Sequence, residues 1–202
     1  MSRKKIFYLG FFTLIALGFF AFIAYAIPGF IKPHMPPIST VQPFAFVNQD
    51  GKHITEKDIQ GKVVAVNFFF TTCKGICPKM SNNLLPIHKK YKNEPDFLIL
   101  SHTCDPERDS VGVLKHYADS LKVDTNKWIF LTGRKDSLYN MARHSYKIDD
   151  PANFVQNISD DFLHTQFIAL VNKKGDVVKI YDGIKPSEMK EMEKDISRLL
   201  KE

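Results

Sequence analysis

Two cysteines stand four positions apart, directly after an apolar run of the sequence. The run Val63–Phe70 predicts a buried strand, and Pro78 marks the first turn of a helix. Cys73 and Cys77 therefore fall between a strand end and a helix N-terminus, which stabilises thiolate over thiol. At this spacing the two sulfurs can converge on one point. Such a pair holds a soft metal or exchanges disulfides, and these residues leave both chemistries open.

His164 is a further candidate because of where it stands in the sequence. It separates a polar loop, residues 147–163, from an apolar strand predicted at Thr165–Val171. A loop of about 17 residues is long enough to indicate function. Position alone leaves open whether His164 binds a ligand or serves the structure. Other histidines are expected in solvent, on turns or helix faces: His53, His88, His116 and His144.

The elements that must position these residues follow from hydrophobic periodicity and turn signals. Strands are predicted at 44–47, 52–54, 63–70, 97–103, 128–132, 165–171 and 177–182. Helices are predicted at 73–93, 105–122, 136–146 and 186–200. This order predicts an α/β fold: a thioredoxin-like mixed sheet, half parallel and half antiparallel, flanked by helices. Because ligand sites form outside the carboxyl ends of parallel strands, Cys73, His102 and Cys104 should share one rim.

An apolar stretch precedes this domain. Residues 6–27 carry no charge and are long enough to cross a bilayer as a transmembrane helix. The basic residues within positions 1–5 place the N-terminus in the cytoplasm and the rest outside. A cleaved signal peptide is the alternative, since residues 24–26 read Ala-Tyr-Ala, but the stretch exceeds a usual signal h-region. We expect a tail at 1–5, an anchor at 6–27, a Pro-rich spacer at 28–42 and a domain at 43–202.

Composition narrows the class of function. The 202 residues carry a formal net charge of +6, and three of the positive charges, Arg3, Lys4 and Lys5, flank the anchor. The remaining charge of about +3 is too small and too spread to indicate nucleic-acid binding. Three cysteines are too few for a disulfide scaffold, and a domain of this size buries a core without one. We therefore expect the cysteines to have a chemical role and the domain to be a monomer.

As a set, four motifs in this order and spacing resemble the Sco/SenC family, over about residues 42 to 200. They are Thr71-Thr72-Cys73-x-x-x-Cys77-Pro78, Asp105-Pro106-Glu107-Arg108-Asp109, Leu131-Thr132-Gly133, and His164 before an apolar strand. Members of this family are membrane-anchored, thioredoxin-like copper proteins that help to assemble the dinuclear copper site of cytochrome c oxidase. The resemblance implies that Cys73, Cys77 and His164 bind copper, as Cu(I) or Cu(II), and that the recipient is the copper-accepting subunit of a cytochrome c oxidase.

The chemistry of the implied ligands agrees with copper. Two thiolates and an imidazole suit Cu(I), which tolerates three-coordination, whereas structural zinc sites usually have four ligands. Only about five residues precede the apolar stretch, too few for an organellar transit peptide. We therefore expect a single-pass protein of a bacterial inner membrane, with its soluble domain on the periplasmic side.

Three positions depart from the family pattern. Lys74 replaces a common Pro, and Leu163 replaces an Asp that usually precedes the histidine, a place that Asp160 or Asp161 could fill. Cys104 stands where an aliphatic residue is usual. Together with His102, which points to the same side of the strand, it is a candidate auxiliary ligand or resolving thiol. The alternative is a small buried cysteine that packs as a hydrophobe.

A membrane-anchored thiol–disulfide oxidoreductase is the alternative function, with Cys73 and Cys77 as its redox disulfide and an exported protein or the oxidase subunit as its substrate. Three features disfavour it. Thioredoxin-type enzymes have Cys-x-x-Cys, but position 76 is Ile; they also have a cis-Pro where this chain has His164. Peroxiredoxins have Thr or Ser three residues before the nucleophile, and here that residue is Phe70. We therefore expect a metal carrier rather than an enzyme.

Overall fold

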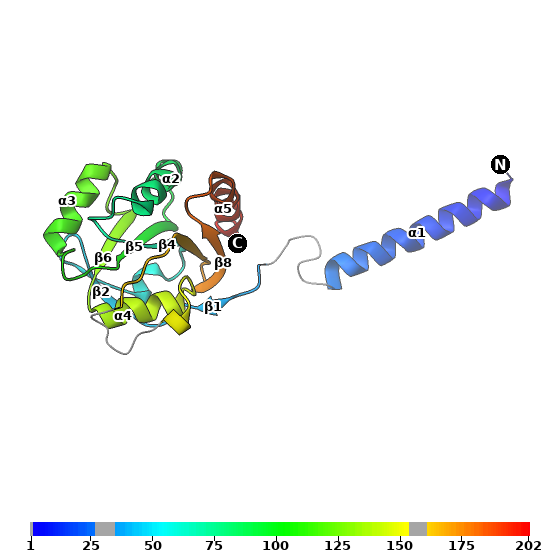
Figure 1. Ribbon diagram of the computed structural model, residues 1–202. Coiled ribbons are helices and arrows are strands. Elements are labelled where there is room, and N and C mark those ends of the chain that lie inside the picture. The colour runs from blue at the N-terminus through cyan, green and yellow to red at the C-terminus, as the bar shows by residue number, and fades with distance from the viewer. Residues whose placement is uncertain (1, 27–34, 154–160) are drawn as a thin grey trace. The chain divides into compact units, whose positions relative to one another are not determined.

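The computed structural model describes residues 2–26, 35–153 and 161–202, in two compact units that divide between Pro36 and Pro37. The first unit contains a single helix, α1 (Arg3–Ala26), labelled in Figure 1. Within it, Arg3–Ile23 has a mean hydropathy of 2.4 and is long and apolar enough to cross a membrane. This helix fits the predicted anchor. The first part of the predicted spacer, residues 27–34, lies outside the described residues.

The second unit is built on one mixed sheet. Its strands are β1 (Ser39–Thr40), β2 (Ala45–Asn48), β3 (His53–Thr55), β4 (Val63–Phe69), β5 (Phe97–Thr103), β6 (Trp128–Thr132), β7 (Phe167–Val171) and β8 (Asp176–Asp182). Its helices are α2 (Ile76–Tyr91), α3 (Val111–Leu121), α4 (Lys135–Asn140) and α5 (Pro186–Leu199), with a π-helical turn η2 (Met141–Ser145) after α4. Two 3₁₀ turns complete the described elements, η1 (Glu56–Ile59) and η3 (Pro151–Asn153).

The strands lie in the order β1-β8-β7-β4-β5-β6-β2-β3. β4 pairs in parallel with β5, and β5 with β6, whereas the other pairs are antiparallel. β4 and β5 lie at the centre and are buried along their whole length, which explains their continuous apolar runs. The predicted thioredoxin-like sheet with a parallel and an antiparallel half is confirmed.

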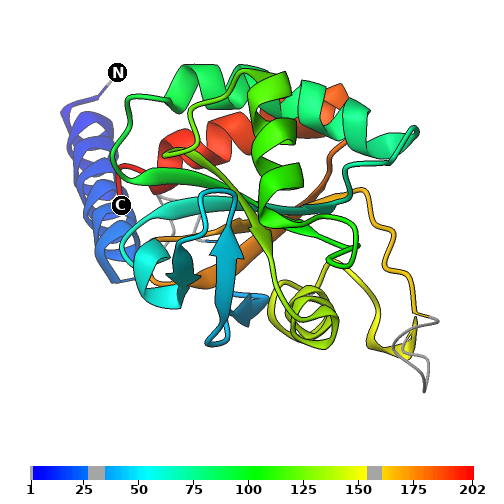
Figure 2. The ribbon, with the colours of Figure 1, turned by 90° about the vertical axis from the view of Figure 1, so that its left-hand side faces the viewer.

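Helices cover both faces of this sheet. Figures 1 and 2 show α2, α3 and α5 on one face and α4 on the other. The core under α4 includes Phe46, Phe68 and Leu100, together with Tyr139 from α4 itself. Because successive strand residues alternate between faces, the side chains of β5 at even positions point into this core. The carboxyl ends of β4 and β5 open toward the start of α2, where the candidate site lies.

Two local predictions are wrong. The segment Asp105–Asp109 does not open a helix, because α3 begins only at Val111, with Ser110 as its N-cap residue. The cause is tertiary: Asp109 is 1% exposed and accepts hydrogen bonds from other segments. His88, predicted in solvent, is buried on α2, and its Nε2 accepts a hydrogen bond of 3.2 Å from the backbone N–H of Asp124.

Candidate metal centre

The two cysteines lie where the sequence predicts them, between the end of β4 and the start of α2. The backbone N–H of Cys73 donates to the carbonyl of Phe70 over 3.2 Å, which closes a tight turn after the strand. Gly75 is the N-cap residue of α2, so Cys77 is the second residue of the helix. Both thiols are free; Cys73 is partly exposed and Cys77 is buried.

The surroundings push the two thiols in opposite directions. Burial opposes ionisation of Cys73, but hydrogen bonds from the Cys77 thiol and from the backbone N–H groups of residues 75–77 outweigh it and lower the pKa of Cys73. Burial and the hydrogen bond with Cys73 raise the pKa of Cys77 to about 12. The pair therefore combines an accessible thiol that ionises readily with a buried thiol that keeps its proton until a cation displaces it.

The buried carboxylate of Asp109 fixes the cysteine turn to the sheet. Its two oxygens accept hydrogen bonds from the hydroxyls of Thr71 and Thr103, and the backbone N–H of Thr71 donates to it over 3.2 Å. Thr71 follows β4 and Thr103 ends β5, so one side chain joins the ends of two parallel strands. Asp109 therefore gives the turn before Cys73 a rigid support.

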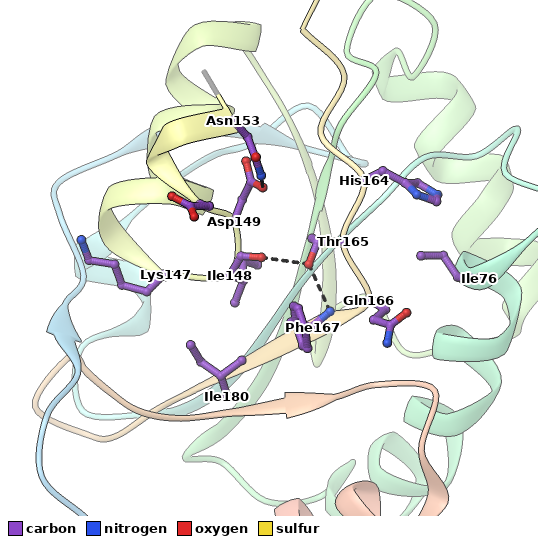
Figure 3. A pocket seen from close by; sticks show the side chains of 11 residues that line it. Ile76, Lys147, Ile148, Asp149, Asn153, His164, Thr165, Gln166, Phe167 and Ile180 are labelled. Carbon is purple, nitrogen blue, oxygen red and sulfur yellow. Dashed lines mark hydrogen bonds between the residues drawn. The ribbon is translucent and has the colours of Figure 1, made fainter. Parts of the chain in front are cut away.

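His164 lies beside this turn, on the segment that leads into β7. Its side chain is exposed, and its ring centroid lies 6.1 Å from that of Phe70, the residue whose carbonyl holds Cys73. His164 and Ile76, the first residue of α2, both line an open cavity of about 740 Å³. In Figure 3 the imidazole points from its own segment toward the first residues of α2.

The structure brings the predicted ligands to one region without closing a metal site. Cys73 and Cys77 are in contact through their thiols. Among the described residues, however, no three His, Cys, Asp or Glu side chains are grouped closely enough to hold an ion. A small movement of the segment around His164 toward Cys73 would be needed to complete a three-ligand set.

The two candidate auxiliary residues are buried in the core under α4. Cys104 is 2% exposed and packs with apolar residues there, and burial raises the pKa of its thiol. His102 is fully buried, and its ring stacks on that of Phe68 with centroids 4.9 Å apart. The position of Cys104 is the one expected of a small packed hydrophobe.

Neither candidate replacement for the missing Asp before His164 is seen to contact the imidazole. Asp161 is buried and forms an ion pair with Arg143, over 2.6 Å. Asp160 lies outside the described residues. Three supporting residues, Asp109, Tyr139 and Arg143, were not singled out from the sequence. Their partners lie 18 to 38 positions away, so no local pattern marks them.

The arrangement has the donors that a soft, monovalent cation prefers. Two sulfurs that can share one cation sit at a helix N-terminus, and an imidazole lies within reach on an exposed segment. Thiolate and imidazole together are typical ligands of copper. The residues present therefore fit a copper ion as cargo.

Comparison with known proteins agrees with this chemistry. The family model SCO1/SenC matches residues 33–201. A SCO1 protein homolog from Bacillus subtilis is 35% identical over 148 residues, which cover 71% of this chain and 74% of that protein.

Solved structures share the fold over the same part of the chain. BsSco, described as a member of the Sco family of cytochrome c oxidase assembly proteins with a disulfide switch, has a TM-score of 0.70 and 30% identity over 84% of this chain and 99% of its own. Arabidopsis thaliana ScoI, solved with copper bound, has a TM-score of 0.62 and 28% identity over 79% of this chain and 99% of its own. Since the family model covers most of the chain and these structures share its sheet and helices, this chain belongs to the SCO1/SenC family.

Proposed function

We propose that this protein is a membrane-anchored copper carrier. It binds one copper ion through Cys73, Cys77 and His164 and delivers it to the copper-accepting subunit of a cytochrome c oxidase. The observation that carries the proposal is the pair of thiols in mutual hydrogen bonding at the start of α2, with an exposed imidazole on the neighbouring segment. The copper-bound relative supports the choice of metal.

A three-ligand site suits a carrier because it leaves the ion open to attack. A thiolate of the recipient can add to the copper before a carrier ligand leaves, so the ion never becomes free. Exposure of the proposed ligands falls from His164 through Cys73 to Cys77, which is 2% exposed. An incoming ligand therefore reaches the ion from the side of His164.

A titration of the full chain in detergent with Cu(I), without oxygen and against a chromophoric competitor, tests the ligand set. Cys73→Ala and His164→Ala should each weaken binding, and loss of the thiolate should cost more than about 100-fold, beyond the usual effect of an outer-shell change. His144→Ala, an exposed histidine on η2, and Cys104→Ala are the matched controls and should bind as the wild type does. Equal affinities of the wild type, Cys73→Ala and His164→Ala would contradict the proposal.

We also propose that α1 spans a bacterial inner membrane once and that the copper-binding domain lies on the periplasmic side. Support comes from the apolar length of α1 and from the basic residues Arg3, Lys4 and Lys5 before its apolar core. Alkaline phosphatase fused after Glu202 should be active in cells, because it folds only after export, whereas a cytoplasmic reporter fused there should be silent. The opposite pattern would place the domain in the cytoplasm.

The comparisons do not favour the alternative function of a thiol–disulfide oxidoreductase. The fusion of both ideas in one assay is simple: the metal-free protein should reduce insulin no faster than Cys73→Ala does. Rapid turnover by the wild type alone would restore the alternative.

A further inference from the structure

The segment that carries His164, Asp161–Thr165, is held to the rest of the domain at three points. The hydroxyl of Tyr139 accepts a hydrogen bond of 3.1 Å from the backbone N–H of Leu163. The hydroxyl of Thr165 donates to the carbonyl of Ile148 over 2.9 Å. The third tether is Arg143, whose guanidinium contacts Asp161. The imidazole itself has a ring contact with Phe70 but no hydrogen bond among the described residues. Its position is therefore set by its backbone.

The Arg143 tether is a buried and bidentate ion pair. Nη1 and Nη2 of Arg143 donate to the two oxygens of Asp161 over 2.6 and 3.0 Å, and Nε donates to Asp149 over 2.7 Å. The side chains of Arg143 and Asp161 are only 4% and 5% exposed, and that of Asp149 is 11% exposed. Only a planar guanidinium can make this set of parallel bonds, so Lys cannot replace it.

The inward direction of Arg143 follows from the π-helical turn in which it lies. Within η2, Arg143 is buried whereas the next residue, His144, is exposed. A π-turn inserts an extra residue into a helix, and such turns are frequent at functional sites. The same side chain lies over the ring of Tyr139, with 5.5 Å between the guanidinium carbon and the ring centroid. Two of the three tethers of the His164 segment are thus packed against each other.

We propose that Arg143 is a positioning residue for the metal ligand His164. By fixing Asp161, three residues before the histidine, it holds the segment where the imidazole can reach an ion on the two cysteines. This inference rests on the proposed function, because it requires His164 to be a ligand. A purely structural role would stabilise the fold without acting on the metal.

The test compares Cu(II) affinity in the full chain in detergent, because an imidazole contributes more to Cu(II) than to Cu(I). Arg143→Lys keeps the charge but loses the bidentate fork, and Asp161→Asn keeps the shape of the acceptor. We expect each to weaken Cu(II) binding by about 10- to 100-fold and to change the visible absorption of the complex. Ile196→Ala, in the buried face of α5 away from the site, is the control for general destabilisation and should leave both unchanged.

A double-mutant cycle separates the two roles. In the His164→Ala background, Arg143→Lys should change Cu(II) affinity by less than about twofold, because its effect acts through the missing imidazole. An equal loss in both backgrounds, or wild-type affinity and absorption of folded Arg143→Lys and Asp161→Asn, would overturn the inference alone. If His164→Ala itself binds Cu(II) as the wild type does, the proposed ligand set fails, and the positioning role fails with it.

Discussion

His102 provides a test of the core next to the candidate site, because it is a neutral imidazole enclosed by aromatic rings. It is fully buried, stacks on Phe68, and has the rings of Phe46 and Tyr146 at 5.4 Å. Neither ring nitrogen has a hydrogen-bond partner among the described residues. Each unpartnered buried atom costs about 1–3 kcal/mol, whereas each ring contact contributes about 0.5–1.5 kcal/mol. We therefore expect His102→Leu to increase the free energy of unfolding by about 1 kcal/mol at pH 7.

The pH dependence gives a second and sharper magnitude. Burial lowers the pKa of His102 to about 3 in the folded state, while an unfolded chain has the ordinary value of about 6.5. Between these values the unfolded state binds more protons, so the stability from this residue is present above pH 6.5 and is lost as the pH falls. Between pH 7 and pH 5 the wild type should lose about 1.9 kcal/mol through His102. Leucine does not titrate, so the advantage of His102→Leu should grow to about 3 kcal/mol at pH 5.

Urea unfolding of the full chain in detergent, followed by tryptophan fluorescence, measures both numbers. Trp128 is the single tryptophan of the sequence; it is fully buried in β6, and its indole N–H donates to the hydroxyl of Ser101 over 2.8 Å. Its signal therefore reports on the folded domain and not on α1. His116→Leu, an exposed histidine on α3, is the control and should keep the wild-type dependence on pH. A His102→Leu variant that loses as much stability as the wild type between pH 7 and pH 5 would refute the reasoning.

Three further predictions concern the supports of the site. Iodoacetamide at pH 7 should label Cys73 well before Cys77, because Cys73 is partly exposed with a lowered pKa; mass spectrometry after cleavage at Lys74 separates the two, and equal rates would contradict this. Asp109→Ala should lower the free energy of unfolding by about 3 kcal/mol, since it leaves two buried threonine hydroxyls unpaired. Ser145→Ala removes the acceptor of the backbone N–H of residue 42, 2.9 Å away, and should cost about 1 kcal/mol and speed proteolysis before β2; unchanged cleavage would argue against it.

Much of the fold could be predicted because its central strands are buried on both faces. β4 and β5 appear as continuous apolar runs, and their order with the helices leaves few sheet topologies. The start of α3 could not be predicted. The pattern Asp-Pro-Glu-Arg-Asp has the residues of a helix N-terminus, but Asp109 finds better partners in Thr71, 38 positions away, and Thr103. A tertiary contact thus overrides a local capping signal.

The candidate site divides in the same way. Cys73 and Cys77 could be predicted, because their spacing, the preceding strand and the following helix all lie within a few residues. Arg143 could not, since it stands between ordinary helix residues and its partner Asp161 is 18 positions away. His88 was mistaken for a solvent-exposed residue because the segment that covers it, around Asp124, lies 36 positions later. Support from distant segments leaves no local pattern to detect.

The two kinds of ligand in the proposed site are held by different parts of the fold, and this bears on how a carrier could release its cargo. The thiols belong to one turn that the buried carboxylate of Asp109 ties to β4 and β5. His164 belongs to a separate segment, whose position depends on the ion pair of Arg143 with Asp161. Movement of that segment changes the distance of the imidazole from the thiols and leaves the thiols where they are. In the proposed carrier the nitrogen ligand is therefore the one that leaves first, and the recipient takes the ion from the two sulfurs.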